Sequence, residues 1–118
     1  MFQSILSKLV TRTGARWAMI VGVDGVLPET NSRSFRTQAE GLAAEYGLFY
    51  RASRKAAGDT DMGGLLSSLL VTQQGKLLFQ TLTGDYFLIL LLEPDAHAGK
   101  ALYEMSRLTE TIERELVF

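Results

Sequence analysis

The stretch that decides the fold runs from Leu65 to Leu92 and reads LLSSLLVTQQGKLLFQTLTGDYFLILLL. The turn-forming pairs Gln74-Gly75 and Gly84-Asp85 divide it into three apolar runs, which are Leu65–Thr72, Lys76–Leu82 and Tyr86–Leu92. Short connections with glycine, where positive φ is easily reached, are typical of β-hairpins. The stretch therefore predicts an antiparallel meander. Its last run is apolar at every position, which indicates a central strand covered on both faces.

Upstream, a second interior strand and its hairpin partner are expected. Ala15–Val23 shows almost no alternation between apolar and polar residues, and Asp24-Gly25 is a strong hairpin turn. The returning segment, Val26–Thr30, contains Pro28, which cannot donate a hydrogen bond to a strand ladder and belongs at a sheet edge. The strand predicted at Leu65–Thr72 has neither proline nor charge. It is therefore expected to form a bare edge that needs a partner.

Three helices are predicted around these strands. The N-terminal one has apolar residues on one face and ends at Gly14, with the stripe Phe2, Ile5, Leu6, Leu9 and Val10. A long helix begins near Phe35. The C-terminal one follows Glu93-Pro94-Asp95 and has the stripe Ala98, Ala101, Met105, Leu108, Ile112 and Leu116.

The long helix carries two stripes. The sheet-facing stripe is bulky and consists of Phe35, Ala39, Leu42, Tyr46, Phe49 and Ala56, with Tyr50 at its margin. The opposite stripe is small and uncharged and consists of Thr37, Gly41, Ala44 and Leu48. It indicates either a helix that tolerates small residues or close approach by a second helix. Arg51, Arg54 and Lys55 follow as a basic cluster, which either complements the helix dipole or contacts an acidic partner.

Two interior strands covered on both faces require helices on both sides of one sheet. The predicted fold is therefore an α+β sandwich with a five-stranded antiparallel sheet. The long helix covers one face, and the N- and C-terminal helices share the other. A chain of 118 residues is expected to form a single domain, residues 1–118.

Composition excludes several function classes. The formal net charge is −1, so no basic face for nucleic acid is expected. The chain has no cysteine, which excludes disulfides and thiolate chemistry. The longest apolar run, Phe87–Leu92, is far shorter than the ~20 residues of a membrane-spanning helix. Without membrane insertion or a signal-peptide pattern, a cytoplasmic location is expected.

No catalytic or metal-binding motif is present, so no enzyme activity and no cofactor are expected. His97, the only histidine, lies beside a helix N-terminus, where its protonated form is disfavoured. Ser67 and Ser68 lie in a strand without a nucleophile elbow. Asp59 and Asp61 lack the further carboxylates of a calcium loop, so no metal site is predicted.

Three segments resemble the roadblock / dynein light-chain family, in particular its bacterial MglB-like members. Gly14–Leu27 is similar to the family's first hairpin with its Asp-Gly turn. Gln74–Leu78 followed by Gly84–Leu90 is similar to its last two strands. Glu93–Ala101 is similar to the link into its C-terminal helix, where a glycine beside a basic residue is typical. The order of elements agrees over nearly the whole chain.

The resemblance implies the strand order 2-1-5-4-3 and a homodimer that pairs the third strands and the long helices. The implied dimer interface is Thr37, Gly41, Ala44, Leu48, Leu65, Ser67, Leu69 and Val71. It also implies binding to a small Ras-like GTPase, as an activator of GTP hydrolysis or as a scaffold. Arg51, Arg54 and Lys55 are the candidate partner-binding residues. Two alternatives of similar topology are a ligand-sensing PAS- or GAF-like module and a longin-type adaptor.

Overall fold

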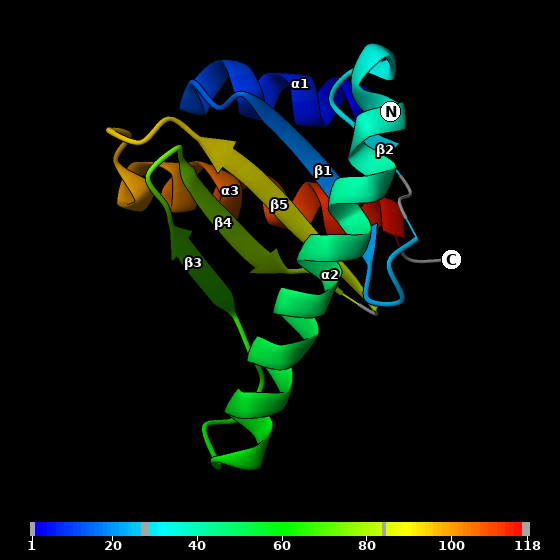
Figure 1. Ribbon diagram of the computed structural model, residues 1–118. Helices are drawn as coiled ribbons and strands as arrows, with labels where there is room; N and C mark the ends of the chain where they lie inside the picture. The colour runs from blue at the N-terminus through cyan, green and yellow to red at the C-terminus, as the bar shows by residue number, and fades with distance from the viewer. Residues whose placement is uncertain (1, 27–28, 84, 117–118) are drawn as a thin grey trace.

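Figure 1 shows the computed structural model of the chain, which describes residues 2–26, 29–83 and 85–116. The elements follow the predicted order of helix, two strands, long helix, three strands and helix. A short 3-10 turn precedes the long helix. In chain order they are α1 (Phe2–Thr13), β1 (Trp17–Gly22), β2 (Glu29–Thr30), η1 (Arg33–Phe35), α2 (Arg36–Asp59), β3 (Ser67–Val71), β4 (Lys76–Thr81), β5 (Tyr86–Leu92) and α3 (Ala98–Leu116).

The sheet is antiparallel and has the strand order β2-β1-β5-β4-β3, as predicted. The apolar strand β5 is central, pairing Leu88 with Ile20 of β1 and Leu90 with Leu78 of β4. Every residue of β1 is buried, and so is most of β5. The continuous apolar runs therefore reflect cover on both faces of the sheet.

Alternate side chains of the sheet enter two separate cores. Phe87 and Ile89 of β5 belong to the core under α2, whereas Leu88 and Leu90 belong to the core under α1 and α3. In Figure 1, α2 lies on one side of the sheet, and α1 and α3 lie on the other. Each large apolar side chain buried in this way contributes about 1.5–3 kcal/mol to stability. The predicted three-layer arrangement is confirmed.

An aromatic layer fills the space between α2 and the sheet. Tyr50 stacks on Phe87 with ring centroids 4.0 Å apart, and its hydroxyl lies 2.7 Å from the hydroxyl of Thr81. Tyr50 is fully buried rather than marginal as predicted, while Ala56 is exposed rather than facing the sheet. The sheet-facing side of α2 is rotated toward Ala39, Ala43 and Tyr50, which explains the burial of Tyr50. Ala56 is exposed because the part of α2 after Tyr50 extends beyond the sheet, where none of its residues is buried.

The edge strands are shorter than predicted. β3 covers Ser67–Val71 rather than 65–72, because Leu65 packs partly buried against the α2-side core, and Thr72 belongs to the turn into β4. β2 is described only at Glu29–Thr30. Pro28, predicted to protect that edge, lies outside the described residues, and so does Gly84 of the predicted β4–β5 turn.

The two described hairpin glycines serve different purposes. Gly25 has a φ of +90°, as predicted for its turn. Gly75 does not adopt a positive φ. A Cβ there would lie 2.8 Å from the carbonyl oxygen of Leu92 and 3.1 Å from Cδ1 of Leu91. Close approach of β5, rather than backbone conformation, therefore requires glycine at position 75.

Ion pairs link elements that are distant in sequence. Arg16 donates two hydrogen bonds of 2.8 Å to the Glu93 carboxylate, which joins the start of β1 to the end of β5. The Arg16 guanidinium thereby lowers the pKa of Glu93 below its ordinary value. Between the helices, Arg12 of α1 lies 3.8 Å from Glu104 of α3. The first contact therefore links the ends of two neighbouring strands, and the second links the two helices on the same face of the sheet.

We expect Gly75→Ala to lower the free energy of unfolding by about 1–3 kcal/mol, because the added methyl group is forced against the main chain of β5. Gly58→Ala is the matched control, since a Cβ at Gly58 in α2 meets no atom within 4 Å. This control should leave stability unchanged or raise it by up to ~1 kcal/mol. Urea unfolding followed by circular dichroism measures both variants. Equal stability of Gly75→Ala and the wild type would contradict the packing argument.

Candidate interaction surface

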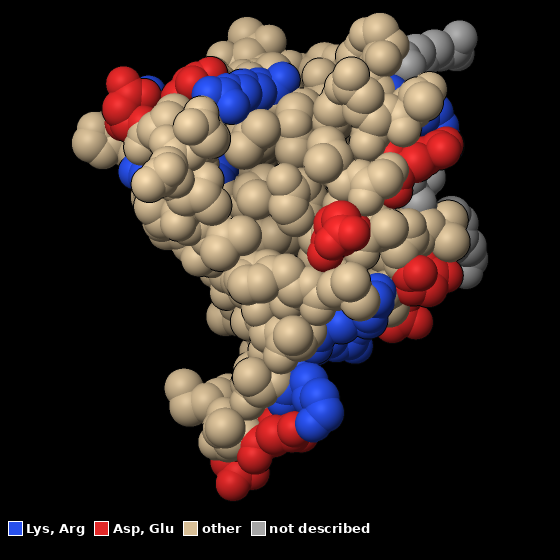
Figure 2. All heavy atoms as spheres, viewed as in Figure 1, with Lys and Arg blue, Asp and Glu red and all other residues tan. Residues whose placement is uncertain are grey.

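The outer edge of β3 is apolar and accessible. β3 pairs with β4 on one side and ends the sheet on the other. Leu69 and Val71 are 46% and 61% exposed, and Leu66, just before the strand, is 77% exposed. Ser67 and Ser68 are the only polar residues of β3, and the strand has no charge. The surface around this edge is formed largely by uncharged residues (Figure 2). Such an edge normally finds a partner strand.

The small stripe of α2 is solvent-accessible, as its interpretation as a contact surface requires. Thr37, Gly41, Ala44 and Leu48 are all exposed, and Leu48 is 58% exposed. A Cβ at Gly41 would meet no atom within 4 Å. At Ala44 this surface adjoins the β1–β2 turn, because a Cβ on Gly25 would lie 3.9 Å from the Ala44 Cα. Gly41 and Leu48 are therefore the more open positions.

The predicted basic cluster is divided among three contacts. Arg51 donates a hydrogen bond to the carbonyl oxygen of Val23 and thereby anchors the β1–β2 turn on α2. Arg54 lies 3.9 Å from Asp85 in the β4–β5 turn, and Lys55 pairs with Asp59 one helical turn onward. The side chains of Arg54 and Lys55 are about half and three-quarters exposed.

The cluster also lies in a different part of the helix than predicted. α2 continues to Asp59 and has no basic residue in its last turn, so the cluster does not cap the helix C-terminus. In Figure 1, the C-terminal part of α2 projects past the sheet. Arg54 and Lys55 are thus presented on a protruding, accessible segment, whereas Arg51 has a structural contact.

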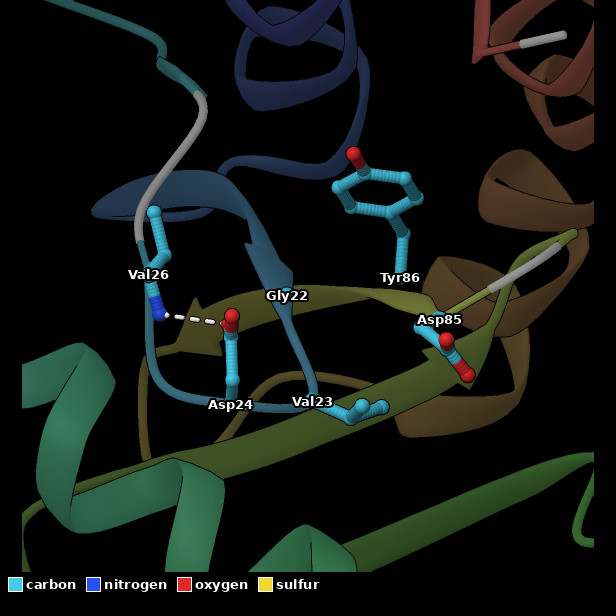
Figure 3. Close-up of a pocket in the computed structure, with 6 residues that line it drawn as sticks. All are labelled: Gly22, Val23, Asp24, Val26, Asp85 and Tyr86. Atoms are coloured by element: carbon cyan, nitrogen blue, oxygen red, sulfur yellow. Dashed lines mark hydrogen bonds between the residues drawn. The ribbon is translucent and has the colours of Figure 1, made fainter.

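One pocket of about 470 Å³ lies between the β1–β2 and β4–β5 turns. Its lining, drawn in Figure 3, is Gly22, Val23, Asp24, Val26, Asp85 and Tyr86. The Asp24 carboxylate is used locally, because it accepts a 3.0 Å hydrogen bond from the Val26 amide. The pocket is separate from the aromatic layer between α2 and the sheet. Between α2 and the sheet, where a PAS- or GAF-like ligand would lie, aromatic rings such as those of Tyr50 and Phe87 pack against each other.

The described residues offer neither a metal centre nor a membrane span. Within residues 2–26, 29–83 and 85–116, no group of three or more His, Cys, Asp or Glu side chains is placed to hold a metal ion. In the same part of the chain, none of the helices combines the length and apolar character needed to cross a bilayer.

Sequence reasoning missed the exposed Met62, and it placed the exposed Leu66 in the predicted edge strand without distinguishing it from Leu65. Met62 and Leu66 are both 77% exposed and lie in the connection between α2 and β3. The run Leu65-Leu66 was predicted to be strand, and the pattern gave no way to tell which leucine packs inward. In the structure Leu65 packs against the core and Leu66 points to solvent.

Solved structures of several bacterial proteins share this fold. A roadblock/LC7 domain from Streptomyces avermitilis matches with a TM-score of 0.86 and 22% identity, covering 97% of this chain and 96% of that one. MglB from Myxococcus xanthus matches with a TM-score of 0.86 and 10% identity, covering 97% and 93%. An MglB described as having a tetrameric arrangement matches with a TM-score of 0.82 and 18% identity, covering 94% of this chain and 84% of that one. These TM-scores establish a shared fold.

Sequence comparison adds the family. No protein of curated function matches the chain significantly. The sequence model of the Roadblock/LC7 domain matches residues 1–93, which extend from α1 through β5 and leave α3 outside the match. Because this match covers well over half of the 118 residues, and the strand order agrees with the family's fold, the chain belongs to the Roadblock/LC7 domain family.

Proposed function

We propose that this protein is a homodimeric, non-enzymatic regulator or scaffold of a small Ras-like GTPase in the cytoplasm. The observation that carries the proposal is the bare apolar edge of β3 in a roadblock fold. The tetrameric arrangement of a structurally similar MglB supports self-association on this fold. Residues 1–118 would act as one domain, and the dimer would be the unit that the GTPase recognises.

The β3 edge favours a second copy of the chain as its partner. An uncharged strand can pair with an identical strand without placing like charges opposite one another. Leu69 and Val71 would lose their solvent exposure in such a pair. A strand pair together with a helix pair is compatible with a standard interface of ~1,600 Å².

The position of α2 fits the same dimer. Identical antiparallel strands in one continuous sheet are related by a two-fold axis normal to the sheet. That axis places the partner's α2 on the same face and antiparallel to the first α2. The open positions Gly41 and Leu48 would contribute to the helix contact, with Thr37 and Ala44 beside them. Leu65, Ser67, Leu69 and Val71 would form the strand contact.

The GTPase contact is proposed for the protruding part of α2. Arg54 and Lys55 are exposed, and their acidic partners Asp85 and Asp59 are exposed too. Surface ion pairs of this kind contribute about 0–1 kcal/mol, so they exchange readily for an acidic group on a partner. Arg51 would position the β1–β2 turn next to this contact through its bond to Val23.

Leu48→Glu should raise the dimer dissociation constant by about ten-fold or more, because it places an unpaired charge in the helix contact. Tyr103→Glu is the matched control: Tyr103 is 61% exposed, close to the 58% of Leu48, but lies in α3, on the other face of the sheet from α2. Sedimentation over a range of concentrations measures both. A wild-type chain that stays monomeric at every concentration would overturn the proposed dimer.

The double variant Arg54→Glu and Lys55→Glu should weaken GTPase binding by about ten-fold or more and leave the dimer intact. Lys8→Glu, on the exposed side of α1, is the control and should bind normally. Binding is measured with Ras-like GTPases purified from the source cell, loaded with GDP or a non-hydrolysable GTP analogue. Hydrolysis rates with and without the dimer then separate an activator from a scaffold. Failure of the wild-type dimer to bind any of them would contradict the proposal.

A further inference from the structure

We propose that the two β3 strands pair with Leu69 on the two-fold axis, so that Leu69 faces its own copy. This inference rests on the proposed dimer and specifies its register. The register determines which side chains meet across the dimer. It follows from the hydrogen bonds that β3 makes to its neighbour β4.

The bonds at both ends of β3 show which of its residues point toward β4. The Thr81 amide donates to the Leu66 carbonyl at 2.9 Å, and the Thr72 amide donates to the Gly75 carbonyl at 2.9 Å. In an antiparallel ladder, hydrogen-bonded and non-hydrogen-bonded residue pairs alternate. Ser68 and Leu70, which face Phe79 and Leu77, therefore bond to β4. The N–H and C=O groups of the other residues, Ser67, Leu69 and Val71, point to the free edge.

This alternation restricts the registers that a symmetric pair can adopt. With the axis at Leu69, Ser67 faces Val71 of the other copy, and all the outward N–H and C=O groups of both strands are bonded. With the axis at Ser68, Val71 falls opposite Leu65, which lies outside the strand. With the axis at Leu70, Ser67 falls opposite Gln73, which also lies outside it. The Leu69 register is the one that satisfies the whole edge.

The side chains agree with this register. Leu69 and Val71 lie on the same face as Leu78, which belongs to the core under α1 and α3. Both are nevertheless exposed in the single chain. Across the axis, the Leu69 side chains of the two copies would contact each other, with a Val71 on either side. The result is an uncharged apolar strip that continues from one copy to the other.

Charge exchange at Leu69 tests the register. Leu69→Lys alone and Leu69→Glu alone should each weaken self-association by about ten-fold or more, because each places like charges opposite one another. An equimolar mixture of the two should restore the dimer. Ser67→Lys alone should be tolerated better, since its two copies would be separated by about 13 Å along the strands. Sedimentation measures all of these. If Ser67→Glu or Val71→Glu restores the dimer with Leu69→Lys better than Leu69→Glu does, the register is overturned.

Cysteine bridging provides a second test that keeps the charge of the strand unchanged. The chain has no cysteine, so introduced thiols are the only ones present. Leu69→Cys should be bridged to its own copy by mild oxidation, whereas Ser67→Cys should be bridged only when mixed with Val71→Cys. If the protein is dimeric but forms the Ser67–Leu69 or Leu69–Val71 bridge instead, the register is wrong and the dimer stands. If the wild type is monomeric, both the register and the dimer are wrong.

Discussion

The main-chain N–H and C=O groups on the outer side of β3 have no partner strand in the single chain, and the proposed dimer follows from them. A strand edge without charge, with accessible leucine and valine side chains, is unfavourable in water and is normally covered or paired. The N–H and C=O groups of Ser67, Leu69 and Val71 face that edge. An identical strand can satisfy them all at once, which makes the exposed edge self-complementary.

Both faces of the sheet are covered by packed cores, so the groups available for binding lie at the surface of the protein. Aromatic side chains fill the layer between α2 and the sheet, and the pocket between the two turns is lined in part by Val23 and Tyr86, which pack against the two cores. Arg51 uses its charge within the chain, while Arg54 and Lys55 retain exposed charge on a protruding helix end. These features favour a protein that acts by binding other proteins over one that encloses a small ligand.

Much of the fold could be predicted from the sequence, because uninterrupted apolar runs such as Phe87–Leu92 occur where a strand is covered on both faces. Details that depend on packing could not be predicted. Tyr50 was placed at the margin of the sheet-facing stripe of its helix, since a sequence pattern cannot fix the rotation of a helix to within one residue. Gly75 was assigned to turn geometry, because its approach to Leu92 joins elements distant in sequence. The accessible stripe of α2 was predicted, whereas the separate contacts of Arg51, Arg54 and Lys55 were not.

Residue-resolved amide exchange, measured over a range of protein concentrations, shows whether the free edge of β3 pairs with a second copy. In the single chain, Ser68 and Leu70 donate to β4, so their amides exchange slowly at any concentration. If β3 pairs with its copy, the amides of Ser67, Leu69 and Val71 exchange quickly in dilute solution and become protected together as the concentration rises. Fast exchange at these three positions in concentrated solution, with Ser68 and Leu70 still protected, would contradict this pairing.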